Sequence, residues 1–367
     1  MVAPPFPAAV RRDPARRRGR GRPRDSRRAC RRHFRKVRQL GRYHPGKTRP
    51  DRARRLILGI HMRITILATF FAISHTPVVM CVAGILVFLI ALWAAKNDIA
   101  QASGLDKIVA LSNLCFAVPL AVFGALHLSA VEIIVPMVPK YMPWRLFWAY
   151  FVGFALLAAS LSIATKIQVR WSGLLLGIMM FTFVAMLHIP RALANPRDRF
   201  AWVIVIREMS FAGGGWIFAG SALREQSHEQ GHGFGRKLIT VGRVLVAIAA
   251  IFYGVENFLH PLNVPGVPLE KMMPLWIPAR LFIGYATGAI LLLTGASILL
   301  GKKIRMAATY LGAWIVLLVL FVYGPILIVS LMDPSTGVKI EGINYFADTL
   351  LFAGAILALA SATVRTE

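Results

Sequence analysis

Apolar residues gather into nine long stretches, each long enough to cross a bilayer as a helix of about 20 residues. The stretches are Pro77–Ala95, Ile108–Val131, Leu146–Thr165, Trp171–Ile189, Phe200–Leu223, Leu238–Leu259, Leu281–Leu300, Met306–Leu331 and Ile343–Ala362. Short loops marked by charge or proline join them, which favours a helix bundle over a barrel. The predicted fold class is therefore all-α, a polytopic helical membrane protein.

A tenth stretch, Leu56–Ile73, is less clear because His61 and Arg63 lie within it. It is either a further span or a signal sequence.

Composition agrees with a membrane location, since 57% of the 367 residues are apolar, more than a soluble protein of this size can bury. Cys30, Cys81 and Cys115 lie far apart without paired spacing. The sequence therefore gives no support for a disulfide framework, attached haem c or a cysteine-rich zinc site.

The net charge of +27 belongs mainly to a tail. Residues 1–55 hold 21 of the 43 Lys and Arg residues and 3 of the 16 Asp and Glu residues, so two thirds of the net charge lies there. Arg, Pro and Gly dominate this segment, so residues 1–61 are expected to be a disordered basic tail, or the true start is Met62. No recognisable nucleic-acid module is present, so we expect no specific nucleic-acid partner.

Positive charges in the short loops indicate an orientation. Eleven Lys and Arg residues follow one side of the predicted spans and eight follow the other, and the first group includes Lys302, Lys303 and Arg305. This weak bias places the first group in the cytoplasm. Nine spans would then put the Arg-rich tail outside, so the tail is absent, Leu56–Ile73 also crosses, or the orientation is reversed.

The last eight spans form an internal repeat. The segment Pro143-Trp-Arg-Leu-Phe, with Tyr150 and Gly153 beyond it, recurs at an offset of 135 as Pro278-Ala-Arg-Leu-Phe with Tyr285 and Gly288. The same offset relates Gly177 to Gly312 and Pro190 to Pro325; further on, Phe211-Ala-Gly matches Phe352-Ala-Gly at an offset of 141.

Because each copy has four spans, both enter the membrane in the same direction. We therefore predict two parallel four-helix bundles plus one leading helix, related by a pseudo-twofold axis along the membrane normal. The expected division is a leading helix and loop at 62–106, a first unit at 107–223, a polar linker loop at 224–237 and a second unit at 238–364.

The repeated unit resembles the DoxX-like family of four-span membrane proteins over roughly residues 107–362. The second copy carries the likeness in Tyr253-Gly-Val-Glu-Asn-Phe-Leu-His-Pro261, then Pro265, Pro268, Pro274, Pro278 and the helix start at Arg280; the first keeps Phe123-Gly124, His127, Pro136, Pro139 and Pro143. The resemblance implies a four-helix membrane bundle, and in some members a link to quinone-coupled sulfur or thiol oxidation with partner subunits or cysteines. This chain departs from those members because it has no thiol pair.

Ionisable residues within spans are costly and therefore candidates for function. Arg207 and Glu208 lie near the middle of one span, and the repeat places Asp348 opposite Arg207. We predict an ion pair between Arg207 and Asp348 that joins the two copies. Such a pair would fix helix packing or take part in transport.

Further candidates lie near span ends on one predicted side, where they would share a pocket that could bind a ligand or relay protons to a quinone. They are His127, His188 and His260 with Glu132, Glu256 and Asn257. Arg145 and Arg280 each begin a helix after a proline, and Tyr150 and Tyr285 follow five residues later. These arginines either anchor loops at the lipid interface or bind an anionic ligand.

These residues leave the activity open, because no catalytic, metal or cofactor motif stands out. The first hypothesis is an accessory subunit in a bacterial inner membrane that binds a quinone or lipid between its two halves, alone or with a redox partner subunit. A small-solute transporter and a subunit of a quinone-linked oxidoreductase are the alternatives. Transport would require interrupted helices at matching places in the two copies; Pro119 and Gly213–Gly215 are the candidate interruptions, and neither recurs as one in the other copy.

Overall fold

The computed structural model describes residues 50–226, 231–267 and 271–363. The chain forms two compact units, Met1–His61 and Met62–Glu367. The predicted basic tail lies almost wholly outside the described residues. The structure therefore does not test whether residues 1–61 are a disordered tail or whether the chain starts at Met62.

Nine helical segments of the described chain are long and apolar enough to cross a membrane, as the sequence predicts. They are His75–Gln101, Asp106–Ser129, Arg145–Thr165, Val169–Ala194, Arg199–Glu225, Gly233–Leu259, Arg280–Leu299, Ile304–Met332 and Thr336–Ala362. The only strand-type pairing in the described ranges is a single bridge between Asn263 and Met272. The all-α, multi-pass fold class is confirmed.

The structure extends several helices beyond their predicted ends. Helix α1 runs from Pro50 to Gln101 without a break, so no turn separates Leu56–Ile73 from the first span. The predicted linker loop at 224–237 is also wrong for most of its length, because α8 (Arg199–Gln226) and α9 (Gly231–Leu259) continue into it. Gly220 and Gly235 let these two helices approach closely at this level, where a Cβ on Gly235 would lie 2.8 Å from the Gly220 carbonyl oxygen.

Each copy contains four membrane helices with one interruption. The first copy comprises α2 (Asp106–Val109) and α3 (Ser112–Ser129), α4 (Val131–Ile134), η1 (Val135–Met137), α5 (Arg145–Thr165), α6 (Val169–Phe183), η2 (Val184–His188), α7 (Ile189–Ala194) and α8. The second comprises α9, α10 (Arg280–Leu299), α11 (Ile304–Leu318), η3 (Val319–Tyr323), α12 (Gly324–Met332) and α13 (Thr336–Ala362).

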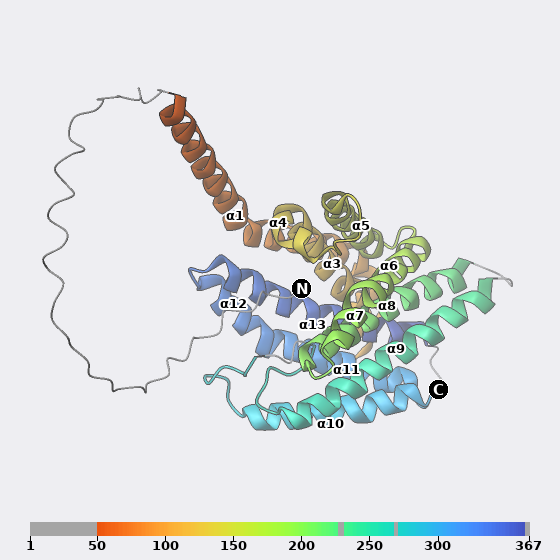
Figure 1. The fold of residues 1–367 in the computed structure, drawn as a ribbon. Coiled ribbons are helices and arrows are strands. Elements are labelled where there is room, and N and C mark those ends of the chain that lie inside the picture. Colours follow the sequence, from red (N-terminus) through yellow and green to blue (C-terminus); the bar gives the residue numbers. More distant parts are fainter. Residues whose placement is uncertain (1–49, 227–230, 268–270, 364–367) are drawn as a thin grey trace, which may run out of the picture. The chain divides into compact units, whose positions relative to one another are not determined.

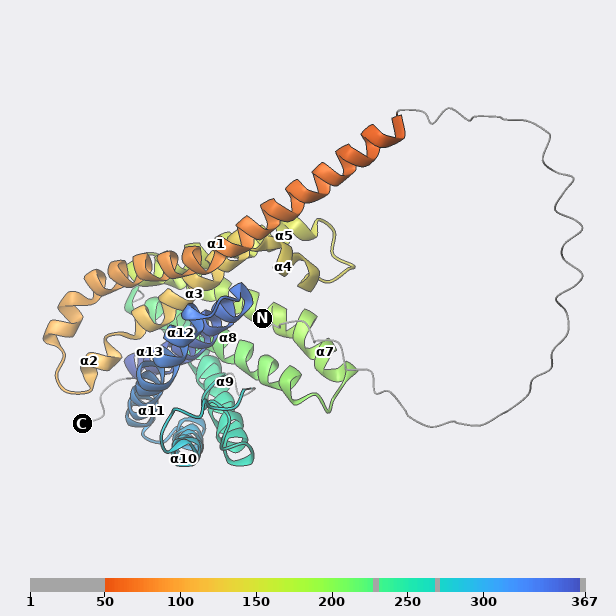
Figure 2. The same ribbon diagram turned by 90° about the vertical axis from the view of Figure 1, so that its left-hand side faces the viewer.

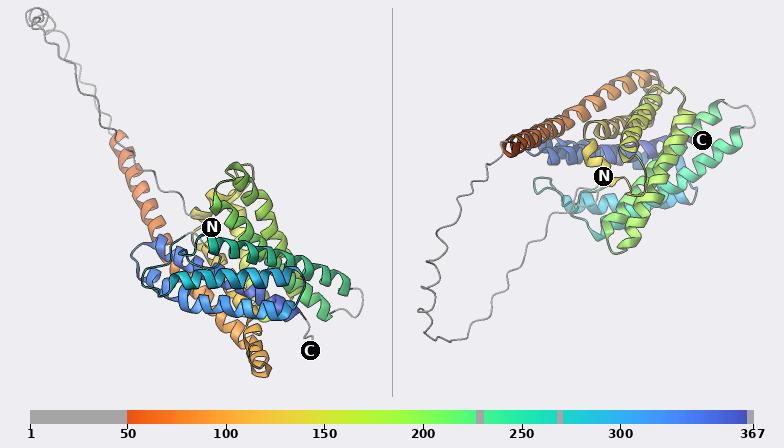
Figure 3. Two further views of the ribbon diagram at one scale, coloured as in Figure 1. Left: turned by 90° about the horizontal axis from the view of Figure 1, so that it is seen from below. Right: turned by 45° about the horizontal axis from the view of Figure 1, so that its top comes forward.

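The last helix of each copy lies at the centre. The membrane windows of α8 and α13 are 78% and 83% buried, against 33% for α10. These two helices pack on each other and lie between the α3–α5 pair and the α9–α10 pair (Figures 1 and 2). The first helix of each copy packs on the last helix of the other, α3 on α13 and α9 on α8, so the copies interlock. Helices α9, α10 and α11 lie side by side on one flank (Figure 3).

Local backbone geometry recurs at the offset predicted from the repeat. Trp144 and Ala279 both precede a membrane helix with a left-handed backbone, at φ of 50° and 51°. Gln168 and Lys303 do the same before the next helix, at 58° and 47°. Left-handed conformations are uncommon for residues other than glycine, so two matched pairs are strong support for a duplicated unit.

A matched helix interruption is the clearest shared feature. Each copy has a single π-helical turn in its third span, at η2 (Val184–His188) and η3 (Val319–Tyr323). Each turn is followed after one residue by a proline, Pro190 or Pro325. Proline lacks an N–H and its ring clashes with the carbonyl four residues earlier, so widening of the preceding turn relieves the helix.

The leading helix packs on the first helix of the first copy. Thr76 of α1 donates a hydrogen bond to the Ser129 carbonyl at 3.1 Å, and Gly84 lets α1 approach the Val122 side chain of α3. As a result the α3 window is 72% buried, whereas that of its counterpart α9 is 44% buried. The two halves therefore share a backbone plan but face different surroundings.

Candidate functional site: a central polar cluster

The predicted ion pair between the two copies is present. Arg207 of α8 donates through Nη1 to Asp348 Oδ2 of α13 at 2.8 Å, and both residues are buried. Arg207 lies eight residues into its span and Asp348 twelve, so both charges are inside the membrane-spanning segments, about 12 Å and 18 Å from the helix starts. A charge pair at this depth costs desolvation and joins the central helices of both copies.

Glu208 completes a cluster of three charges. Its Oε1 accepts a hydrogen bond from Arg207 Nη2 at 3.2 Å, so one guanidinium holds two carboxylates. His188 at the end of η2 and His127 of α3 are both within electrostatic range of Glu208. Nδ1 of His127 is also hydrogen-bonded to the Phe123 carbonyl at 2.8 Å. The cluster thus draws residues from α3, η2, α8 and α13.

The second copy supplies hydroxyl and amide groups at the corresponding places. Tyr323, which ends η3 as His188 ends η2, donates to the Pro265 carbonyl at 2.6 Å. Tyr253 of α9 is fully buried and donates to the Val203 carbonyl of α8 at 3.2 Å. Asn257, the counterpart of His127, donates to the Tyr253 carbonyl at 2.8 Å, as His127 bonds Phe123. Equivalent positions of the two copies therefore carry different polar side chains.

Three buried polar atoms in this region have no hydrogen-bond partner among the described residues. They are Arg207 Nε, Asn257 Oδ1 and Asn344 Oδ1. Asn344 precedes Asp348 by one helical turn, so both lie on the same face of α13. Buried polar atoms are usually satisfied. Arg207 thus has one spare donor, Asn344 a spare acceptor one turn from Asp348, and Asn257 a spare acceptor one turn from Tyr253. Such atoms could bind a small polar ligand.

A loop segment, Val264–Val267, packs beside the second-copy half of the cluster. Val264 and Val267 are buried, and the carbonyl of Pro265 between them receives the Tyr323 hydrogen bond. Gly266 has φ of +106°, and a Cβ there would lie 3.3 Å from the Tyr323 hydroxyl oxygen and 3.5 Å from the Thr349 methyl carbon. Glycine is needed for both the backbone angle and the space.

Replacing Gly266 by alanine should therefore destabilise the loop segment by about 1–3 kcal/mol. The change should lower the midpoint of thermal unfolding of purified protein in detergent. Gly233→Ala is the matched control, because no atom lies within 4 Å of a Cβ built there. Equal midpoints for the two variants would contradict the packing of Gly266 described above.

Other predicted site residues have different neighbours. Glu256 of α9 is buried and pairs with Arg199 at the start of α8, at 2.9 Å between Oε2 and Nη1. Glu132 and His260 are exposed. The structure thus brings His127 and His188 to the charge cluster but does not gather all six predicted side chains into a single pocket.

Arg145 and Arg280 anchor loops. Arg145 donates to the carbonyls of Val135 and Val138 at 2.6 Å and 2.9 Å, and Arg280 donates to the carbonyl of Met273 at 3.2 Å. The Val138 and Met273 acceptors are again related by the repeat offset. Tyr285 packs on the Phe258 ring with 5.8 Å between centroids, and Tyr150 is exposed. These contacts agree with the interpretation of both arginines as interface anchors.

No group of three or more His, Cys, Asp or Glu side chains suited to a metal ion occurs in the described part of the chain. Cys81 and Cys115 are free thiols, the latter buried.

Sequence reasoning missed Tyr253, Tyr323, Asn344 and the π-helical turns. Neither Pro119 nor Gly213–Gly215 interrupts its helix, since α3 and α8 continue through them. The available signal was the matched pair Pro190 and Pro325, because a proline inside a span at the same place in both copies predicts the same local distortion.

Compared with known proteins, the chain matches no family model, no curated protein and no solved structure.

Proposed function

We propose that the protein is a carrier for a small polar solute, with the central polar cluster as its binding site. The observation that carries the proposal is the pair of π-helical turns, η2 and η3, which end beside the cluster in His188 and Tyr323. Parallel repeats whose sites lie at the repeat interface, beside discontinuous helices, are a recurring plan in secondary transporters.

The arrangement suggests how such a carrier would work. The short helices α7 and α12 follow the π-helical turns and carry the prolines in their first turns, where helix hydrogen bonding is weakest. Movement of these segments would open the cluster toward one side of the membrane, while the Arg207–Asp348 pair holds the central helices together. Arg207 Nε would donate a hydrogen bond to a polar group of the solute, and Asn257 and Asn344 would accept hydrogen bonds from it.

Two-sided access to the cluster tests this proposal without knowledge of the solute. A cysteine at Thr349, buried beside Asp348, would be introduced into a variant lacking the three native cysteines. Membrane vesicles containing this variant, prepared both right-side-out and inside-out, would be treated with a membrane-impermeant maleimide. We expect labelling from both sides, at least several-fold faster than for Leu351→Cys, which is equally buried on the same helix. Labelling from neither side, or from one side alone, would exclude alternating access.

A second candidate is a quinone-binding subunit, in keeping with the resemblance to DoxX-like proteins. It is favoured by His188 beside the cluster, because its ring N–H could donate a hydrogen bond to a quinone carbonyl, whereas the Tyr253 and Tyr323 hydroxyls would first have to leave the Val203 and Pro265 carbonyls. No thiol pair is present in the sequence to take part in thiol oxidation, so a redox partner subunit would have to supply the second half-reaction.

Solvent extraction of purified protein separates the two candidates. A quinone subunit should retain about one quinone per chain and lose it in Arg207→Met, and its Thr349→Cys variant should not be labelled from water. The carrier should retain none and should be labelled from both sides.

A further inference from the structure

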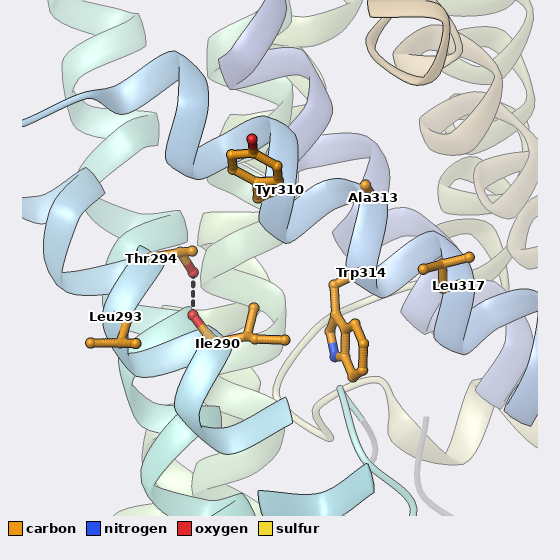
Figure 4. Close-up of a pocket in the computed structure, with 7 residues that line it drawn as sticks. All are labelled: Ile290, Leu293, Thr294, Tyr310, Ala313, Trp314 and Leu317. Carbon is orange, nitrogen blue, oxygen red and sulfur yellow. Dashed lines mark hydrogen bonds between the residues drawn. The ribbon is translucent and has the colours of Figure 1, made fainter. Parts of the chain in front are cut away.

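A groove lies between α10 and α11, away from the central cluster. It encloses about 390 Å³ and is lined by Ile290, Leu293, Thr294, Tyr310, Ala313, Trp314 and Leu317. The α10 and α11 side chains face each other across it (Figure 4). Leu293 and Leu317 are 73% and 46% exposed in the chain itself, so the groove opens on the side that meets lipid.

Hydrogen bonds hold two of the polar groups around this groove. The Trp314 indole N–H donates to the Thr287 hydroxyl at 3.1 Å, and Thr287 is fully buried. The Thr294 hydroxyl donates to the Ile290 carbonyl (Figure 4). These bonds satisfy both groups within the protein, and the remaining lining is almost wholly hydrocarbon, which suits a lipid acyl chain.

The turn that closes one end of the groove carries two lysines. Lys302 and Lys303 are exposed and join the two helices that form the groove. A hydrogen bond from Ser297 Oγ to the Lys302 carbonyl fixes the turn. Tyr310 lies seven residues beyond Lys303, about 10 Å along the helix, so the apolar groove begins below a cationic rim. Cationic side chains above an apolar groove complement an anionic lipid headgroup with its acyl chain below.

The first copy keeps the hydrogen bond that fixes the turn, from Ser162 to the Ile167 carbonyl, but lacks the side chains that would meet a lipid. The positions that match Lys302 and Lys303 hold Ile167 and Gln168, and those that match Tyr310 and Trp314 hold Leu175 and Met179. Met179 and Val152 occupy the positions that match Trp314 and Thr287, so this hydrogen bond has no counterpart in the first copy. Because the backbone plan is shared, the difference lies in the side chains that would recognise a lipid.

We propose that the groove between α10 and α11 binds an acyl chain of an anionic phospholipid, with the lipid phosphate at Lys302 and Lys303. The weak charge bias of the loops places this turn on the cytoplasmic side, where anionic lipids are enriched. The site is independent of the proposed carrier function and would hold whichever activity the cluster has.

Photo-cross-linking tests the site directly. The full chain would be placed in phosphatidylcholine vesicles containing a minor share of phosphatidylglycerol, with a diazirine on the acyl chain of one lipid or the other. Cross-linked peptides would be mapped by mass spectrometry. We expect phosphatidylglycerol to label residues 290–317 preferentially over phosphatidylcholine.

Two variants separate the headgroup from the groove. Lys302→Gln with Lys303→Gln should reduce the preference for phosphatidylglycerol by about fivefold for each lysine and leave phosphatidylcholine labelling unchanged. Ala313→Phe should fill the groove and reduce labelling by both lipids. Lys166→Gln, in the corresponding turn of the first copy, is the matched control and should change nothing at residues 290–317.

Equal labelling by the two lipids, or a preference that survives loss of both lysines, would overturn the proposal. Labelling absent from residues 290–317 in the wild-type chain would also overturn it, since the groove would then be covered by protein. Each variant would be compared with wild type by gel filtration, so that loss of folding is recognised separately.

Discussion

Replacing Arg207 by methionine is expected to lower the stability of the folded protein by about 3–5 kcal/mol. The guanidinium is the shared partner of Asp348 and Glu208, so its loss leaves two carboxylates inside the membrane-spanning segments without their cation. Such groups either stay ionised at a high desolvation cost or take up protons. The expected result is a strongly reduced yield and a lower thermal midpoint in detergent.

Asp348→Asn should cost less than Arg207→Met, because Glu208 still neutralises Arg207 in that variant. Lys271→Met is the matched control: it breaks the ion pair between Lys271 and Glu341, whose lysine side chain is 55% exposed. Exposed pairs contribute at most about 1 kcal/mol. If Arg207→Met were tolerated as well as Lys271→Met, the charge cluster would not be buried as described.

The second large effect is expected at the contact between α13 and α3. A Cβ on Gly354 would lie 2.5 Å from the Phe116 backbone nitrogen and 2.7 Å from its Cα, and backbone atoms cannot move aside as a side chain can. Gly354→Val should therefore force the two helices apart and cost several kcal/mol, at or above the usual range of about 1–3 kcal/mol for an overpacked core. Gel filtration and thermal midpoints of the purified variant would measure the loss.

Two further glycine variants test the origin of that effect. Gly213 occupies the matching position in α8, where a Cβ would lie 2.9 Å from the Gly242 carbonyl oxygen, so Gly213→Val should behave like Gly354→Val. Gly337→Ala in the first turn of α13 has no neighbour closer than 3.7 Å and should be neutral or slightly stabilising. A large loss from Gly337→Ala and a small one from Gly354→Val would contradict the interlocked packing of the copies.

Much of the architecture could be predicted from hydrophobicity and the repeat. The nine spans follow from apolar length alone, because lipid permits few alternatives to a helix. The contact between Arg207 and Asp348 followed from the repeat, since a pseudo-twofold axis brings equivalent positions of the two last helices together. Matched landmarks such as Arg145 and Arg280 gave the offset and hence the alignment of the copies.

Other parts could not be predicted because they depend on packing. The helical continuation into residues 224–226 and 231–237 depends on the close approach at Gly220 and Gly235, which overrides the polar character of the segment. The burial of Val264–Val267 depends on Tyr323, which lies far away in the sequence and bonds the Pro265 carbonyl. His127 and His188 lie near the charge cluster, whereas Glu132 and His260 are exposed. This difference follows from the position of each residue along its helix, which apolar patterning does not specify.

The two copies differ most where function is proposed. His188 and Tyr323 end equivalent π-helical turns, Arg207 stands opposite Asp348, and His127 corresponds to Asn257. A duplicated scaffold with unlike side chains at its interface provides one asymmetric site, which suits a ligand without twofold symmetry.

The coupling between positions 207 and 348 tests the central claim, that the two copies are built around one buried charge pair. A double-mutant cycle of Arg207→Met and Asp348→Asn, measured by unfolding in a Glu208→Gln background, removes the second carboxylate and isolates the pair. We predict a coupling energy of about 1–3 kcal/mol, with the double variant more stable than Arg207→Met alone. Additive losses, with no coupling, would contradict the account.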